Sequence, residues 1–207
     1  MADSADEWQG AKDAVFPCLL PPGSQGDPAE RKVDWANEGI QTHAQPLITE
    51  GPCGLVVAFT LQGPGFDVLV NAQHLHDWGI TAEELAVTAG QNLGSWSDGV
   101  GWTDEDSGER RLRSSESGTG RDAARILLPA VRAGLAAELR RGAPPGTRVL
   151  VGLPDRELLV AGALRPGDAE FAGLFHDFVM DHSASADQPI DRRLFELQGD
   201  DLVEFTG

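Results

Sequence analysis

The sequence predicts an α+β fold, in which amphipathic helices pack on a mainly antiparallel sheet built from hairpins. Two observations support this prediction. Strand-like runs come in pairs separated by short turn-forming segments, and helical segments lie between the pairs. Single strands do not alternate with crossover helices, which is the pattern that a parallel sheet requires.

The first pair of strand-like runs covers residues 53–61 and 66–70, which are rich in β-branched and other apolar side chains. The segment between them, Gln62-Gly-Pro-Gly65, consists of turn formers. The pair is therefore expected to form a hairpin that begins the sheet.

Two helices are expected after this hairpin. Gly79 can adopt the left-handed conformation that ends a short helix over residues 72–78. Thr81 as N-cap and Glu84 three residues later form a capping box that starts the second helix. An apolar stripe at helical spacing continues it, through Leu85, Ala89 and Leu93.

A polar stretch over residues 95–120 is rich in Gly, Ser and Asp and predicts a mobile loop or an insertion. Asp122 is a candidate cap for the helix that follows. Pro129 either kinks this helix or begins its main segment, which Gly142 terminates. The apolar stripe of the main segment is Val131, Leu135 and Leu139.

A second hairpin is expected from residues 147–153 and 157–164, which are apolar enough to be central strands and flank a short turn. Asp168 then opens the most regular amphipathic helix of the chain, which must cover one face of the sheet. Its apolar stripe consists of Phe171, Leu174, Phe175, Phe178 and Val179.

The domain organisation follows from these elements. A last hairpin joins residues 194–197 to residues 202–205. Residues 1–45 mix acidic residues, prolines and isolated apolar residues without a period, and they predict a poorly ordered acidic N-terminal arm. Residues 46–207 predict a single α+β domain with a polar insert at about 95–120, because 207 residues bury one substantial core.

The charge balance disfavours two classes of partner. The chain carries 33 Asp and Glu against 16 Lys and Arg, and its net charge of −17 repels nucleic acids and anionic membrane surfaces. The acidic amino terminus does not match a secretory signal, and no apolar run approaches the ~18 residues of a membrane span. We therefore expect a cytoplasmic protein. Cys18 and Cys53 belong to no metal or redox motif and predict reduced, buried thiols.

Four short motifs carry a resemblance to a known family. They are Trp78-Gly-Ile-Thr-Ala-Glu-Glu-Leu85, Asn92-Leu93, Ala123-Ala-Arg-Ile-Leu-Leu-Pro129 and Leu153-Pro-Asp-Arg-Glu-Leu-Leu159. Together they resemble the YtpQ-like family of bacterial proteins, a family of unknown function. The resemblance implies a mixed domain of helices and strands in a bacterial cytosol, and it transfers no catalytic residues. The chain departs from the family pattern in its polar insert at 98–120 and in its histidines at 74 and 76.

The histidine pair His74 and His76 is the candidate for metal chemistry. On a helix, side chains two residues apart point about 200° apart, so that only an extended backbone would place both on one ion. Asp77 and the distant His176 or His182 could complete such a site only through tertiary proximity. The sequence therefore favours a helix-end role for these side chains, with no metal and no cofactor.

The sequence also lacks the local motifs of two other kinds of reaction site. Gly94-Ser-Trp-Ser-Asp-Gly99 has the wrong spacing for a serine-hydrolase elbow. The glycine-rich segments at 63–65 and 99–101 lack the further residues of a phosphate-binding loop.

Two surface segments remain as candidate binding sites. In the polar insert, tryptophans and carboxylates predict a protein-partner site at Trp96, Trp102, Asp104 and Asp106. At the tip of the second hairpin, Asp155, Arg156 and Glu157 are either a ligand site or simply a turn whose charged residues pair with one another.

The functional prediction is a non-enzymatic protein-interaction module, such as an adaptor, an inhibitor or an immunity-like protein. Its partner is expected to be a protein, and the acidic charge of the chain favours a basic one. The alternative is a metal-dependent hydrolase that uses His74, His76 and nearby carboxylates. The oligomeric state is open at this level.

Overall fold

The computed structural model describes residues 4–29, 44–63 and 65–207. The chain divides into two compact units, of which unit 1 comprises Met1–Gly51 and Leu55–Ser97 and unit 2 comprises Pro52–Gly54 and Asp98–Gly207. Helices combine with open, mostly antiparallel sheets in the described residues, so the prediction of an α+β fold is confirmed. Residues 46–207, which the sequence predicts as a single domain, are divided between the two units.

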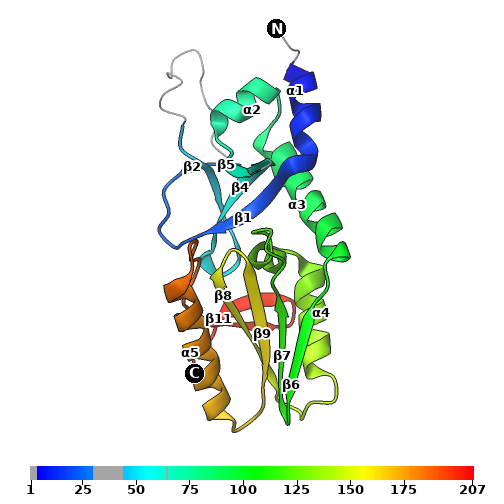
Figure 1. Ribbon diagram of the computed structural model, residues 1–207, viewed down its shortest axis with the longest axis vertical. Helices are drawn as coiled ribbons and strands as arrows, with labels where there is room; N and C mark the ends of the chain where they lie inside the picture. The colour runs from blue at the N-terminus through cyan, green and yellow to red at the C-terminus, as the bar shows by residue number, and fades with distance from the viewer. Residues whose placement is uncertain (1–3, 30–43, 64) are drawn as a thin grey trace. The chain divides into compact units, whose positions relative to one another are not determined.

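Unit 1 is built on a five-stranded sheet of order β1-β4-β3-β2, in which β5 also pairs with β4 (Figure 1). Strand β4 is antiparallel to β1, β3 and β5, whereas β2 is parallel to β3. The strands are β1 (Val15–Leu20), β2 (Asp27–Pro28), β3 (Leu47–Glu50), β4 (Val56–Gly63) and β5 (Phe66–Leu69). The β4–β5 pairing confirms the first predicted hairpin.

The helices of unit 1 are α1 (Ser4–Ala11), α2 (Ala72–Trp78) and α3 (Ala82–Gly99), whose last two residues belong to unit 2. Between α1 and β1 lies the short helix η1 (Lys12–Ala14). The core contains Trp78, Leu85 and Phe59 from α2, α3 and β4. Gly79 ends α2 with φ of 69°, and the reciprocal bonds of Thr81 and Glu84 start α3, so both predicted helix signals are confirmed.

The expectation of a poorly ordered arm over residues 1–45 is corrected for part of its length. β1 is buried and pairs with β4 along its whole length. Because the run Val15-Phe-Pro-Cys-Leu-Leu20 is apolar on both faces, it shows neither the alternation of a half-buried strand nor a helical period. Residues 1–3 and 30–43 of the predicted arm lie outside the described residues.

Unit 2 is built on a six-stranded antiparallel sheet of order β11-β10-β8-β9-β7-β6 (Figure 1). The strands are β6 (Thr103–Ser107), β7 (Arg110–Ser115), β8 (Arg148–Asp155), β9 (Leu158–Leu164), β10 (Phe195–Gln198) and β11 (Asp201–Glu204). The β8–β9 and β10–β11 pairings confirm the second and the last predicted hairpins.

Helices cover the sheet of unit 2. The helices of this unit are α4 (Pro129–Arg140), α5 (Ala169–Ser185) and the short η3 (Pro52–Gly54) and η4 (Ala123–Leu127). Phe171, Phe175 and Val179 of α5 are buried in one core with β8 and β9, as their spacing predicts, whereas Leu174 and Phe178 of the predicted stripe are exposed. The packing is close: a Cβ on Gly152 of β8 would lie 2.4 Å from Cγ2 of Val179. Among the described residues, no helix combines the length and the apolar character that a bilayer-spanning segment needs.

The predicted polar insert at 95–120 is not a single loop. Residues 95–99 belong to α3, while β6 and β7 form a hairpin that ends the sheet of unit 2. Gly108 turns this hairpin with φ of 63°. Leu112 is the one apolar residue of the two strands, so the sequence lacks the apolar alternation by which half-buried strands are recognised.

Candidate functional site

A ladder of ion pairs crosses the hairpin of β6 and β7. Asp104 lies opposite Arg113 in the strand register, and Asp106 lies opposite Arg111. Arg113 binds Asp104 through two hydrogen bonds, of 2.6 Å from Nε to Oδ1 and 2.7 Å from Nη2 to Oδ2. Nε of Arg111 lies 3.1 Å from Oδ1 of Asp106. Strand pairing therefore accounts for the position of both carboxylates that the sequence singled out.

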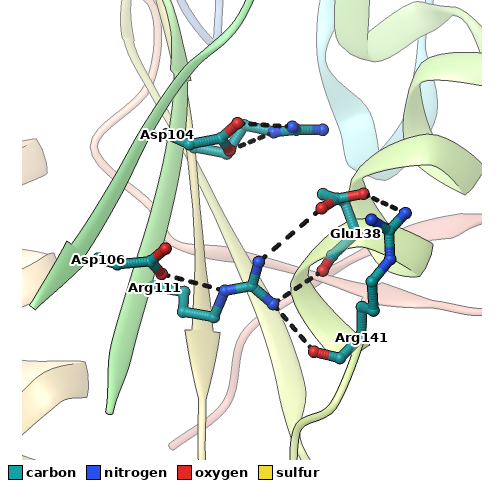
Figure 2. A network of polar contacts seen from close by, with 6 residues as sticks. Asp104, Asp106, Arg111, Glu138 and Arg141 are labelled. Carbon is teal, nitrogen blue, oxygen red and sulfur yellow. Dashed lines mark hydrogen bonds and ion pairs between the residues drawn. The ribbon is translucent and has the colours of Figure 1, made fainter. Parts of the chain in front are cut away.

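Helix α4 extends this ladder, as Figure 2 shows. Nη2 of Arg111 lies 3.8 Å from Oε1 of Glu138, and Nη2 of Arg141 lies 2.5 Å from Oε2 of the same carboxylate. Nη1 of Arg111 donates to the backbone carbonyls of Glu138 and Arg141. A cation at the carboxyl end of a helix satisfies free carbonyls and opposes the helix dipole. Arg111 thus joins β6, β7 and the end of α4.

The hydrogen bond from Arg113 holds the pKa of the Asp104 carboxyl below its usual value, and the charges of Arg113 and Arg111 act in the same direction. Burial acts in the opposite direction. Asp104 is half exposed, so water screens this interaction and it contributes little to stability. The ion pair orients the carboxylate more than it stabilises the fold.

Trp102 lies at the end of this ladder against a buried polar cluster, which we define as Arg125, Ser115 and Asp122, with the exposed Ser117 at its margin. Cζ of Arg125 lies 3.9 Å from the centre of the Trp102 ring, which is a close cation–π distance. Cζ of Arg113 lies 5.9 Å from the same ring. The indole of Trp102 is therefore held in place by two guanidinium groups.

The buried polar cluster connects its charges through hydroxyl groups. Nη1 of Arg125 donates to Oγ of Ser115 at 2.6 Å, and Ser115 in turn donates to Oδ1 of Asp122 at 2.5 Å. Ser117 donates to Oδ2 of Asp122 at 2.6 Å. Burial lowers the pKa of the Arg125 guanidinium, and the charges of Asp122 and Asp98 oppose this shift.

The structure thus brings three of the four predicted partner-binding residues together. Trp102, Asp104 and Asp106 share one end of unit 2, whereas Trp96 lies on α3 in unit 1. The arginines that hold these three residues, and the cluster beneath Trp102, were not predicted. A signal for them was present, since Arg111 and Arg113 alternate along the chain opposite Asp104 and Asp106.

The predicted ligand residues at the second hairpin do converge. Asp155, Arg156 and Glu157 line a hollow of about 190 Å³ together with Asp187 and Gln188. Their contacts are those of a turn: Oδ1 of Asp155 accepts a hydrogen bond from the Glu157 amide at 2.6 Å. Nη1 of Arg156 donates to Oε1 of Gln188 at 2.7 Å. These contacts favour the alternative that the charged residues at the tip serve the turn.

The histidine pair is placed at a helix start. Nδ1 of His74 accepts a hydrogen bond from the backbone amide of Asn71 at 3.2 Å, and the His74 amide donates to the Asn71 side chain. His76 and Asp77 are exposed on α2. Within residues 4–29, 44–63 and 65–207, no three His, Cys, Asp or Glu side chains are grouped closely enough to hold a metal ion. The alternative site at His74, His76 and Asp77 is therefore not assembled.

The environment of His74 makes a prediction about pH. Burial lowers the pKa of its imidazole from the usual 6.5, and the charge of Asp77 opposes this only in part. The unfolded state then binds the proton more tightly, so the contribution of the neutral ring is complete above pH 6.5 and is lost as the pH falls below it. In an NMR titration we expect the His74 midpoint below 6.5. A midpoint at or above that value would contradict the described burial.

Fold and site together define a two-unit α+β protein whose second sheet ends in an acidic strand braced by arginines. No family model, curated protein or solved structure matches the chain. The resemblance to the YtpQ-like family therefore stays a prediction.

Proposed function

We propose that the chain is a non-enzymatic protein-interaction module, in which β6 binds an extended basic segment of a partner protein. The observation that carries this proposal is the position and composition of β6. It is the last strand of the six-stranded sheet, all five of its residues are exposed, and three consecutive residues, Asp104, Glu105 and Asp106, are acidic.

The backbone of β6 supports binding by strand addition. Its inner side pairs with β7, and no strand of the described chain pairs with its outer side. Free amide and carbonyl groups at the edge of a sheet accept an added strand, which is a common mode of peptide recognition. The ion pairs of Arg111 and Arg113 orient the side chains of Asp106 and Asp104, which limits the side-chain freedom that binding would otherwise remove.

The side chains of β6 indicate the charge of the partner. Side chains alternate along a strand, so Glu105 points to the face opposite from Asp104 and Asp106. Glu105 forms no ion pair with any residue that the structure describes. A basic segment could pair with Glu105 directly and would be attracted over a longer range by the net charge of −17. Trp102, fixed beside the strand, offers an aromatic contact at the end of the same edge.

This proposal retains the cytoplasmic location expected from the sequence and does not include nucleic acid as a partner. A membership in the YtpQ-like family is compatible with it, since that family brings no assigned activity. The proposed site differs from the predicted one in two respects. Trp96 lies in the other unit and takes no part, and Glu105 is added as the carboxylate that pairs with the partner.

The proposal is tested with an alternating lysine–valine peptide long enough to span β6. We expect the amide signals of β6 to shift on titration, followed by NMR. Glu105→Lys should weaken binding about tenfold, which corresponds to roughly 1.4 kcal/mol, because it places a like charge in the interface while leaving both ion pairs of the strand intact.

Asp181→Lys is the matched control, since it makes the same change in net charge at an exposed position on α5 of the same unit. It should leave the affinity within about twofold of the parent. Equal losses in the two variants, or shifts distributed over the whole acidic surface, would reduce the observed binding to unspecific charge attraction and reject β6 as the site.

A further inference from the structure

A second hollow in unit 2 has a different chemical character. It has a volume of about 430 Å³ and is lined in part by residues of α5. Its lining comes from α5, from the segment that precedes β10 and from the end of β11, namely Ala172, His176, Arg192, Arg193, Leu194, Glu204 and Phe205. None of these residues belongs to β6 or to the tip of the second hairpin.

The charge of one arginine of the hollow is balanced by two carboxylates. Nη2 of Arg193 lies 2.7 Å from Oδ2 of the buried Asp191, and its Nη1 lies 3.0 Å from Oε2 of Glu204. The hydrogen bond to Asp191 raises the pKa of Arg193, with a further contribution from Glu204 and against the effect of burial. The two carboxylates therefore hold the Arg193 side chain in place, and its guanidinium group is a weak site for an anionic ligand.

The charge of the neighbouring arginine is not balanced by a carboxylate of the described chain. Arg192 is exposed, and its Nε donates to Oγ of Ser183 at 3.3 Å. It forms no ion pair with a carboxylate of the described chain. The bond to Ser183 restrains the guanidinium plane, and the Nη groups that remain are the donors with which arginine binds carboxylates and phosphates.

The other side chains of the hollow suit an anion that carries an organic body. The ring of His176 is half exposed, with Nδ1 3.6 Å from Oδ1 of Asp177, and supplies a second hydrogen-bonding group. Leu194, Ala172 and Phe205 are apolar. The guanidinium of Arg148 lies 4.4 Å from the Phe205 ring and so restrains its position. A volume of this size lies within the range of small-molecule sites.

We propose that this hollow binds a small organic anion, whose carboxylate or phosphate group pairs with Arg192 and His176 and whose apolar body lies on Phe205 and Leu194. The site lies outside the strand edge assigned to a partner protein, and it does not depend on that assignment. The recognition chemistry is that of a single anionic group adjacent to a ring or a short hydrocarbon chain.

The test uses four probes, which are benzoate, phenyl phosphate, inorganic phosphate and benzyl alcohol. Binding is measured by NMR titration of the full chain, with the amide signals of Ala172, His176 and Leu194 as the local readout. We expect both benzoate and phenyl phosphate to shift these signals in a saturable way. Each of the two anions should bind more tightly than benzyl alcohol. A response to inorganic phosphate as strong as that to phenyl phosphate would remove the apolar part of the proposal.

Arg192→Gln should weaken the binding of the better organic anion at least tenfold, because it removes the uncompensated charge. The matched control is Arg165→Gln, which removes the same charge from a side chain that pairs with Glu109 and does not line the hollow. The control should bind as the parent does. Equal affinities for the parent and Arg192→Gln, or equal losses in both variants, would overturn the proposal, and unchanged thermal midpoints would show that both variants are folded.

Discussion

Arg125→Met is expected to lower the free energy of unfolding of unit 2 by about 3–5 kcal/mol. Arg125 is 1% exposed and Asp122 is 0% exposed, so the variant leaves a buried carboxylate without its cation. The hydroxyl groups of Ser115 and Ser117 still donate to Asp122, but they do not compensate its charge. Methionine fills a similar volume, so most of the loss arises from electrostatics and from the lost stacking on Trp102.

Chemical denaturation followed by circular dichroism, together with calorimetry, measures this effect. The double variant Arg125→Met with Asp122→Asn separates charge from packing, because it removes both buried charges. It should recover a substantial part of the stability that the single variant loses. If the single variant unfolds within about 1 kcal/mol of the parent, the buried polar cluster is not a main contributor to the stability of unit 2.

Gly152→Ala is expected to destabilise unit 2 by about 1–3 kcal/mol through overpacking. The new Cβ would lie 2.4 Å from Cγ2 of Val179 and 3.1 Å from Cγ1 of Val160. Both valines are buried in the core between α5 and the sheet, where displacing α5 would also disturb Phe175. The added methyl group therefore forces a shift of the helix or of β8.

Gly173→Ala is the matched control for this substitution. Gly173 is exposed on α5 and an added Cβ would meet no atom within 4 Å, and alanine is favoured over glycine inside a helix by roughly 0.5–1 kcal/mol. Thermal midpoints should thus move down for the first variant and slightly up for the second. A shared direction of change would show that packing between α5 and β8 is looser than described.

Elements marked by local signals could be predicted from the sequence. Gly79 and the pair of Thr81 and Glu84 act over one helical turn, and the structure contains their bonds as expected. The central strands β8 and β9 were recognised because they are continuously apolar between turn residues. In these cases the residues that determine the conformation are neighbours in the chain.

Elements whose character depends on distant residues were missed. β1 is an apolar strand in an acidic region, whereas β6 and β7 are polar strands. The burial of each strand depends on its position in the sheet, and the local sequence does not indicate that position. The division into two units depends on the assignment of Pro52–Gly54 to unit 2, which no local pattern indicates.

The candidate sites show the same difference. Asp104 and Asp106 were found because consecutive acidic residues are visible in the sequence. Their arginine partners follow from strand register, which requires that β6 and β7 be recognised first. His176 and Arg192 line one hollow only because α5 and the segment after it lie beside β11, so this hollow could not be predicted.

The placement of Pro52–Gly54 has a practical consequence. The chain passes between the two units three times, at residues 51/52, 54/55 and 97/98. A fragment that starts at Asp98 lacks these three residues, which contact β11 within unit 2. The halves are interleaved along the polypeptide, and one proteolytic cut cannot release either of them whole.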